Sequence, residues 1–348
     1  MSDGFPFRRG AMAAIVFLAA AAASVAVSAG DRSGSDAGAI SVELGNRLWL
    51  AANRYDNKVY ENDTGNLGSR LRWSGVDSLS NETTLRIMQI GSGAFLKAFA
   101  GLGVNRGGSL DDEDYATDFP TLEGPFTGKF LDTYAKGGRD RQLHGAVDIG
   151  FALPLPASSP IRLAAFVGVF RQQQGLLSKG VRCNADEASN LLCGPPGKVV
   201  VPFDRKSIGF ETTMQGVRTG VEASLEITKR LSLRTEAAWL RNGRFRLDDS
   251  HFLRAQTDSP NPDNNLGPVP NIVSRGKELS GLQLETEFSW AASERLAITA
   301  AARYWRFDSG RADTVFGARL PIPVETGETN ERSRIAQYGM TIGLRYRF

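Results

Sequence analysis

The chain ends on the stretch Gln337-Tyr338-Gly339-Met340-Thr341-Ile342-Gly343-Leu344-Arg345-Tyr346-Arg347-Phe348. From Tyr338 onward every second side chain is apolar, and glycine, threonine and arginine fill the positions between. A period of two predicts one extended strand with an apolar face and a mixed polar face. The apolar face continues to Phe348, whereas the last residues of a soluble domain usually fray. We therefore predict a strand that stays ordered to its last residue; a half-buried strand of a soluble sandwich is the competing interpretation.

Nine earlier segments of alternating hydrophobicity bring the number of predicted strands to ten. They cover residues 40–53, 69–90, 94–102, 141–153, 161–173, 205–227, 231–240, 279–290 and 296–307. The connections between them are alternately short and long. The short ones lie at residues 91–93, 154–160, 228–230 and 291–295, and the long ones at roughly 54–68, 103–140, 174–204, 241–278 and 308–334.

Short turns at one end and long loops at the other are typical of an outer-membrane barrel whose loops are extracellular. We therefore predict an all-β fold, a ten-stranded antiparallel transmembrane β-barrel with long extracellular loops. The faces agree: Phe288 and Trp290 face one way, Glu285 and Glu287 the other. These charges would be costly in a sandwich core, but in a polar lumen they can pair with arginines such as Arg303. Ten strands are too few for a wide aqueous pore, so function is expected in the loops.

The first 29 residues have the layout of a secretory signal peptide. Arg8 and Arg9 precede an apolar run over residues 11–27, which ends on small residues up to Ala29. No other segment has ~18 consecutive apolar residues, so a helical membrane protein is excluded. We predict removal of residues 1–29 and a single barrel domain over residues 30–348, located in a bacterial outer membrane.

Charge and cysteine content narrow the function further. The net charge of +3 gives no argument for nucleic acid as a partner. The two cysteines, Cys183 and Cys193, are close together in an exported chain, which predicts a loop disulfide. A metal site would need further cysteine or histidine nearby, and the sequence has none there.

One of the two histidines lies in a pattern that can carry chemistry. His251 follows Asp249 by two residues in the fourth long connection, or in a strand extension leading into it. In extended backbone the two side chains point the same way, and a carboxylate beside an imidazole can fix its tautomer and raise its basicity. Alone the pattern is weak, since Asp-x-His also occurs by chance.

Four carboxylates stand in a row in the second long connection, Asp111-Asp112-Glu113-Asp114. The spacing lacks the alternating oxygen ligands of a calcium loop, and a solvated loop is the plain interpretation. In extended backbone, however, Asp112 and Asp114 share a face. Two carboxylates held close raise each other's pKa and can position or deprotonate a water molecule.

Together these motifs resemble the omptin family. Gly107-Gly108 followed by Asp112 and Asp114 is similar to the omptin double-glycine loop, and Asp249-Ser250-His251 matches the omptin Asp-x-His between the seventh and eighth strands. The openings of the second and sixth strands are also similar, so the resemblance follows the whole chain in order, with sparse identity outside the motifs.

The resemblance implies an outer-membrane aspartate/histidine endopeptidase with its active site at the extracellular rim. Asp249 and His251 would activate a water molecule, and Asp112 and Asp114 would face it across a groove, with neither metal nor cofactor. Asp56 lies near the position of a family acid that binds substrate. The second pocket acid corresponds to Leu247, which puts a strict preference for basic residues in doubt.

The expected partners are peptide or protein substrates and lipopolysaccharide, on which omptin activity depends, and the chain is expected to be a monomer. Two alternatives remain open. One is a non-catalytic barrel of the same fold that acts as an adhesin or structural protein. The other is a barrel enzyme that modifies lipid A, although no Ser/His pair of the kind those enzymes use stands out.

Overall fold

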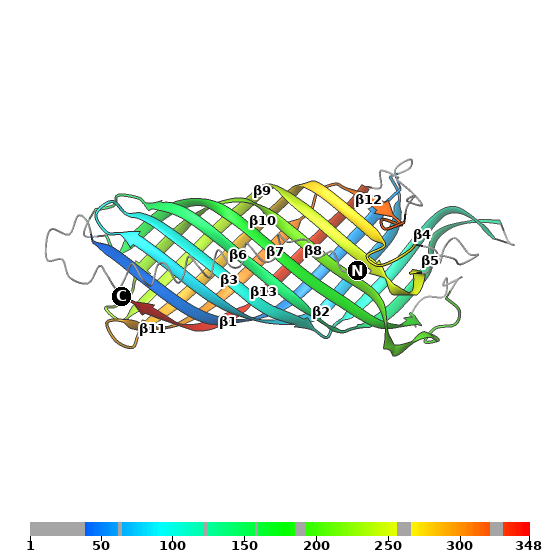
Figure 1. Cartoon of the computed structure of the whole chain (residues 1–348), viewed down its shortest axis with the longest axis horizontal. Helices are drawn as coiled ribbons and strands as arrows, with labels where there is room; N and C mark the ends of the chain where they lie inside the picture. The colour runs from blue at the N-terminus through cyan, green and yellow to red at the C-terminus, as the bar shows by residue number, and fades with distance from the viewer. Residues whose placement is uncertain are drawn as a thin grey trace.

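The computed structural model describes residues 39–61, 65–121, 124–156, 159–184, 193–255, 266–320 and 330–348. Ten long strands wind around one barrel (Figure 1), three of them interrupted. The elements are β1 (Ile40–Tyr60), β2 (Leu67–Gln89), β3 (Ala94–Arg106), β4 (Ser109–Thr121), β5 (Gly124–Gly137), β6 (Arg139–Ala152), β7 (Ile161–Cys183), β8 (Val199–Glu226), β9 (Leu231–His251), the 3-10 turn η2 (Phe252–Arg254), β10 (Ile272–Ala291), β11 (Leu296–Asp308), β12 (Ala312–Phe316) and β13 (Asn330–Arg347).

Antiparallel pairing closes the sheet on itself. β1 pairs with β2 on one side and with β13 on the other, in unbroken register from Glu43↔Arg347 to Tyr60↔Asn330. The predicted closing strand is thus confirmed, and so is the antiparallel barrel. Closure leaves no free edge along the wall, which is what a sheet in a bilayer requires.

The third and fourth barrel strands are each made of two collinear pieces, joined by glycine pairs. β3 pairs with the lower part of β2, and β4 continues along β2 from Ser74 to Ser69. Gly107 and Gly108 join these pieces with positive φ angles of 68° and 78°. On the facing strand, a Cβ on Gly137 would lie 1.9 Å from the Gly107 carbonyl oxygen, so only glycine permits this approach.

The long connections were predicted as loops, and this was wrong for most of their length. Residues 109–121 and 124–137 form a β-hairpin, and β1, β7, β8, β9 and β10 also continue well beyond their predicted ends. Polar side chains on both faces hid these extensions, because outside a bilayer the outer face need not be apolar. The carboxylates at residues 111–114 and the Asp249–His251 pair therefore lie on rigid strands.

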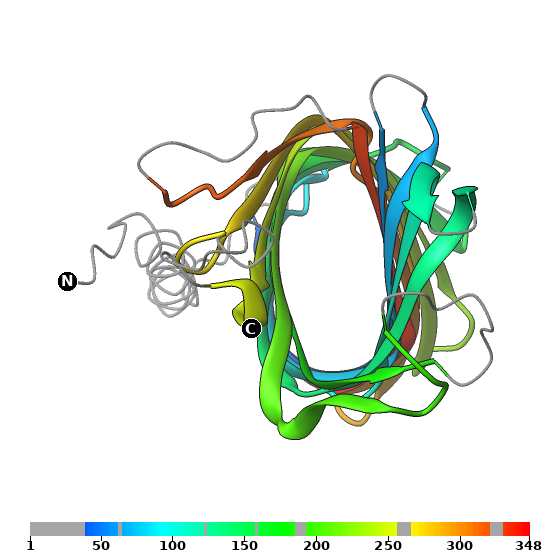
Figure 2. The same cartoon turned by 90° about the vertical axis from the view of Figure 1, so that its right-hand side faces the viewer.

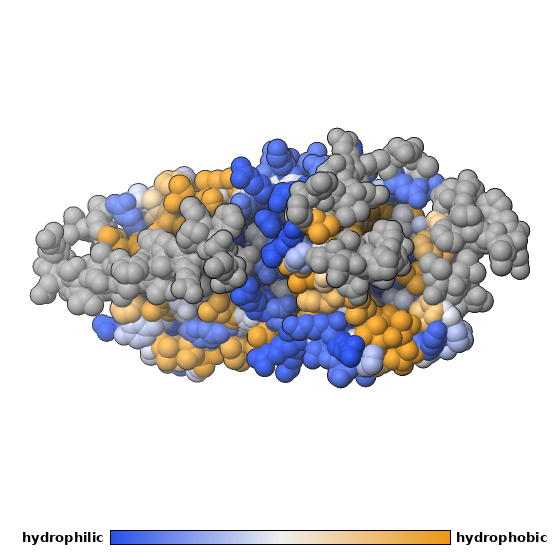
Figure 3. Space-filling model, turned by 45° about the vertical axis from the view of Figure 1, so that its right-hand side comes forward, coloured by the Kyte–Doolittle hydropathy of each residue, from blue (hydrophilic) through white to orange (hydrophobic). Residues whose placement is uncertain are grey.

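An apolar belt surrounds the half of the barrel that ends in the short turns, which we name the turn end. Its outward side chains include Leu50, Val169, Trp239, Phe288 and Met340. In Figure 3 the orange surface of this half gives way to a band of blue side chains. Above the belt β1 carries Arg54, Asp56 and Lys58, so the opposite half, the loop end, extends beyond the apolar surface.

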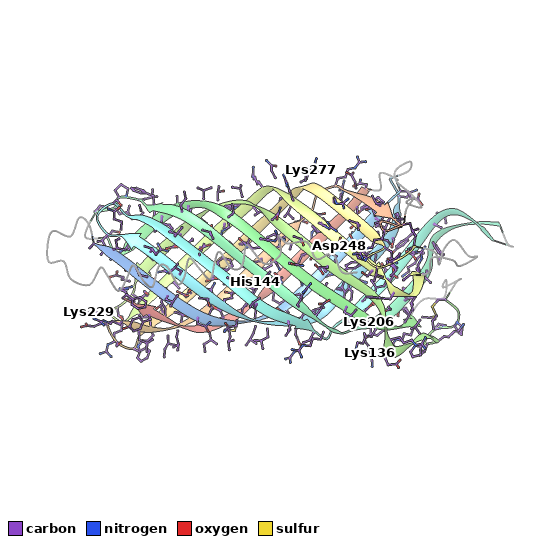
Figure 4. The ribbon with its side chains drawn as sticks, in the orientation of Figure 1. Lys136, His144, Lys206, Lys229, Asp248 and Lys277 are labelled. Carbon is purple, nitrogen blue, oxygen red and sulfur yellow. A yellow bond between two sulfur atoms is a disulfide. The ribbon has the colours of Figure 1, made fainter. Side chains whose placement is uncertain are left out.

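The lumen is filled rather than open. Ion pairs cross it: Arg303 contacts Glu82 at 2.6 Å near the middle, and Arg345 contacts Glu287 at 3.0 Å nearer the turn end, as the alternating charges predicted. His144 belongs to this network, and its Nε2 donates to Oε1 of Glu82 at 2.6 Å (Figure 4). Above it lie buried aromatic rings, Trp49, Trp305, Phe170 and Phe307 among them. The lumen is thus packed below the loop end.

Cys183 and Cys193 form the predicted disulfide at the end of β7. Among the described residues, no helix is both long and apolar enough to cross a bilayer. The predicted signal peptide, residues 1–29, lies outside the described residues, and the division at residue 30 stays a prediction.

Candidate functional site at the loop end of the barrel

His251 is the last residue of β9, and its ring is bonded to Asp249. The imidazole Nε2 donates to Oδ2 of Asp249 at 3.0 Å, as the spacing on one strand face predicted. Because a carboxylate only accepts, this contact places the proton of the neutral ring on Nε2 and leaves Nδ1 as the acceptor nitrogen. Asp249 is 5% exposed, and its backbone is held between Phe210 of β8 and Ile272 of β10. The Asp249–His251 pair is therefore largely shielded from water, and the neighbouring strands β8 and β10 hold its backbone in place.

Asn271 holds the end of β9 where regular pairing with β10 stops. Its Oδ1 accepts from the His251 N–H at 2.9 Å, and its Nδ2 donates to the His251 carbonyl at 3.1 Å. Its own N–H donates to the Asp249 carbonyl. One fully buried amide thus replaces the missing ladder bonds and fixes the backbone that carries the imidazole. No motif singles out this asparagine in the sequence.

Asp112 and Asp114 point into the barrel mouth from β4. Asp112 lies opposite Leu71 of β2, and Asp114 lies opposite Ser69. The alternate residues Asp111 and Glu113 belong to the outer face, where they pair with arginines of β2 at 3.7–4.0 Å. The row of four carboxylates is therefore split by the strand into an inner pair and an outer pair.

Asp112 and Asp114, the inner pair, interact electrostatically with the bonded pair Asp249 and His251, which we name the dyad. Burial raises the pKa of Asp112 well above its usual range, and the neighbouring Asp114 raises it further, while the positive charge of His251 opposes both. Burial also raises the pKa of Asp114, against a hydrogen bond with Ser69 and the charge of His251. Both acids thus interact electrostatically with an imidazole that follows them far along the chain. At neutral pH such a pair retains a proton more readily than two isolated aspartates.

The pKa of the His251 imidazole is raised although the ring is buried. Burial, the largest influence, lowers the pKa of His251, but the charge and hydrogen bond of Asp249 and the charge of Asp112 outweigh it, so the pKa is raised. Figure 2 looks into this mouth: β4 and β5 form one wall, and the end of β9 lies across from them. Three strands, β5, β7 and β8, separate β4 from β9 around the ring.

Aromatic side chains form the floor of the site. Tyr55 packs edge-on to Phe210 with ring centroids 5.5 Å apart, and Trp73 lies 6.0 Å from the same ring. All three are buried in the main hydrophobic cluster, which also contains Leu110 from β4, the strand of the acid pair, and Leu71 from its neighbour β2. This floor separates the site from the ion pairs lower in the lumen and lowers the local dielectric, which strengthens the interactions among the four groups.

Asp56 does not join the other predicted site residues. On β1 the neighbours Tyr55 and Asn57 face the lumen, whereas Asp56 makes two bonds of 3.0 Å with Arg70. The structure therefore brings together Asp112, Asp114, Asp249 and His251 and leaves Asp56 in an ion pair on the alternate face. Leu247 is buried in the core cluster, two residues before Asp249.

Comparison with known proteins bears on the fold. No family model and no curated protein matches the sequence. Among solved structures, the outer membrane protease OmpT from Escherichia coli is similar, with a TM-score of 0.65 and 13% identity over 88% of this chain and 97% of that one. The fold is that of an outer-membrane β-barrel.

Two further outer-membrane barrels are similar at scores too low to carry an argument. The outer membrane protein OprG from Pseudomonas aeruginosa has a TM-score of 0.29 and 10% identity over 89% of this chain and 96% of that one. A FadL homologue from the same organism has a TM-score of 0.24 and 10% identity over 89% and 90%. At these identities the likeness to OmpT concerns the fold alone.

A further acid of the barrel lies beside the dyad. Glu331 of β13 is buried, its Oε2 accepts from the hydroxyls of Ser274 and Thr314, and its Oε1 has no hydrogen-bond partner. Burial raises the pKa of Glu331 to about 7, and the charge of Asp249 adds to this effect. Sequence reasoning missed it, although the alternation of the closing strand, extended backward through Ser333, would have placed it on the lumen face.

Proposed function

We propose that this barrel is an outer-membrane endopeptidase that hydrolyses peptide bonds with a water molecule activated by Asp249 and His251. The observation that carries the proposal is that a bonded Asp–His pair and two protonatable aspartates form one electrostatic site in a barrel mouth. An imidazole oriented by a carboxylate is a general base, and acids with raised pKa values are general acids near neutral pH.

In the proposed reaction His251 takes a proton from water through Nδ1 while the oxygen attacks the scissile carbonyl carbon. Asp249 stabilises the imidazolium that forms. The proton retained by Asp112 or Asp114 is donated in a hydrogen bond to the carbonyl oxygen as negative charge develops there. Collapse of the tetrahedral species breaks the C–N bond, and His251 returns its proton to the leaving amine. The apolar floor keeps these charges out of bulk water.

The loop end is proposed to face the outside of a bacterial cell, and the chain is proposed to act there as a monomer on peptides or proteins. Exposed cations stand on the outer wall of β9 and β10, directly above the apolar belt: Arg241, Arg244, Arg246, Arg275 and Lys277. Lys277 lies on this wall in Figure 4. Guanidinium and ammonium groups directly above the apolar belt are placed to bind the phosphates of lipopolysaccharide. We propose lipopolysaccharide as a required partner that takes no part in the chemical step.

The function is tested by offering a peptide library to the folded barrel, with and without lipopolysaccharide, and sequencing the products. Endopeptidase activity predicts internal cuts that require the folded barrel. A barrel that migrates as folded before heating and cuts no peptide would contradict the proposal. It would favour the alternative of a non-catalytic adhesin or structural barrel, for which the buried apolar Leu247 is the specific argument.

Glu331 is expected to set a moderate preference for a basic residue beside the cut. Replacing Glu331 by glutamine removes the charge of this acid while keeping the size of the side chain and its bonds with Ser274 and Thr314. We expect cleavage beside Arg or Lys to fall about 10-fold relative to cleavage beside Leu, since a lost charged contact costs about 1.5 kcal/mol. Competition between paired peptides measures this ratio, and Asp56→Asn, on the other strand face, should leave it unchanged.

Asn271 is expected to act as a positioning residue. Asn271→Ala releases both backbone groups of His251, so kcat should fall roughly 10- to 100-fold with KM nearly unchanged, because a misplaced base slows chemistry without weakening substrate contacts. Asn271→Asp keeps the acceptor for the His251 N–H and should recover part of the rate. A rise in KM with constant kcat would contradict this role.

A further inference from the structure

Charged side chains at the turn end gather on one arc of the rim. Lys229 and Arg230 lie in the turn between β8 and β9, Arg295 lies in the turn between β10 and β11, and Arg347 is at the end of β13. The two remaining short connections, residues 90–93 and 153–160, contain no charged residue at all. Figure 4 shows Lys229 at this end, opposite to the candidate active site.

Backbone contacts make these elements neighbours. The Ala291 N–H donates to the Arg230 carbonyl at 2.8 Å, and the Arg347 N–H donates to the Arg295 carbonyl at 2.8 Å. The two turns and the end of β13 therefore form one continuous stretch of the rim.

This arc borders a pocket of about 240 Å³ inside the turn-end mouth. We name the pocket the basic mouth. Its lining contains six cations: Lys229, Arg230, Arg234, Arg295, Arg345 and Arg347. It contains three acids: Glu43, Glu226 and Glu294.

The acids of the basic mouth do not satisfy its cations. Glu226 contacts Arg162, which is outside the lining, at 2.9 Å. Glu43 is shared among Arg347 at 2.7 Å and Arg234 and Arg345 at 3.8 Å each, and the two inner arginines also contact acids outside the lining, Glu222 and Glu287. Within the described part of the chain, the three turn cations Lys229, Arg230 and Arg295 have no ion pair.

We propose that the basic mouth is a binding site for an oxyanion, a molecule that presents phosphate or carboxylate groups to the turn end of the barrel. Several guanidinium groups converging in a pocket with low-dielectric walls raise the local concentration of anions, and their planar forks match phosphate and carboxylate geometry. Simple contact with membrane headgroups would call for cations around the whole rim, whereas here they occupy one arc and continue inward to Arg234 and Arg345. The site lies at the other end of the barrel from the proposed peptidase site and is independent of it.

The test uses the full barrel in a non-ionic detergent at low ionic strength, titrated with inorganic pyrophosphate in a calorimeter. The triple variant Lys229→Gln, Arg230→Gln, Arg295→Gln should bind at least 10-fold more weakly than the unaltered chain. The matched control is Arg139→Gln, Arg205→Gln, Lys206→Gln, which removes the same charge from exposed positions toward the loop end that belong to neither proposed phosphate site, and it should bind unchanged. Added salt should weaken binding to the unaltered chain.

A second arm identifies the source of the anion. The same proteins are inserted into vesicles of phosphatidylcholine with and without phosphatidylglycerol, and a spin-labelled phosphatidylglycerol reports occupancy. Pyrophosphate binding lost in the turn variant supports a soluble ligand, and lipid occupancy lost in the turn variant supports a headgroup in the same pocket. Equal behaviour of the turn variant and the control in both arms overturns the proposal. His251→Ala should bind like the unaltered chain, so failure of the peptidase proposal would not affect this outcome.

Discussion

Replacing His251 by alanine should lower kcat/KM for peptide cleavage roughly 10²- to 10⁴-fold, the range that a general base contributes. The Nε2 atom of His251 is bonded to Asp249, so its Nδ1 atom is the nitrogen that accepts the proton from water. Progress curves with a fluorogenic peptide measure the loss. Retention of the heat-modifiable form separates a lost base from a lost fold.

The companion variant Asp249→Asn makes a prediction about pH. Burial alone lowers the pKa of His251, and the charge and hydrogen bond of Asp249 are the main influences that raise it. Since the neutral imidazole is the active form, the rate of the unaltered chain should fall as the pH drops through this raised pKa. Removing the Asp249 charge lowers the pKa, so the acid limb of kcat/KM should move to lower pH while the maximum rate falls.

Asp248→Asn is the matched control for the dyad aspartate. Asp248 precedes Asp249 on the same strand, pairs with Arg246 at 2.7 Å and belongs to the alternate face. Its loss should change neither rate nor pH profile by more than about twofold, as expected for a partly exposed ion pair. An equal effect of both substitutions would mean that the strand, rather than the carboxylate, is what the rate depends on.

The alternation of side chains was enough to predict the barrel, because a bilayer outside and a polar lumen inside impose opposite chemistry on the two faces of every strand. The same alternation did not predict the strand segments that extend above the membrane. There water meets the outer face, so Asp111 and Glu113 are as polar as Asp112 and Asp114, and the pattern that marks a strand disappears. The hairpin of β4 and β5 was read as a loop for this reason.

The site was predictable only as far as its residues are neighbours in sequence. Asp249 and His251 share a face in any extended backbone, and so do Asp112 and Asp114. The two pairs interact only because the closed barrel places β4 and β9 on opposite sides of its mouth. This arrangement was expected only from the resemblance to omptins. Asn271 and Glu331 come from strands without a motif, and Asp56 was assigned one position away from the lumen-facing Asn57.

Asp112→Asn should lower kcat/KM by roughly 10²- to 10⁴-fold, because it removes the proton that the inner pair supplies to the developing oxyanion. Asp114→Asn should act differently. The negative charge of Asp114 is one cause of the raised pKa of Asp112, so a neutral amide in its place lowers that pKa. The protonated form of Asp112 is then lost at lower pH, and the alkaline limb of the rate profile should move toward acid.

Two neighbouring carboxylates serve as controls: Asp111→Asn and Glu113→Gln change the same strand on its outer face, where both acids pair with arginines of β2. Neither should change the rate by more than about twofold. The decisive comparison is Asp112→Asn combined with His251→Ala. Groups that act on one transition state are non-additive, so the double variant should be little slower than the slower single variant. Losses that multiply would mean that the two sides of the mouth act on separate steps, and a single activated water molecule held between them would have to be abandoned.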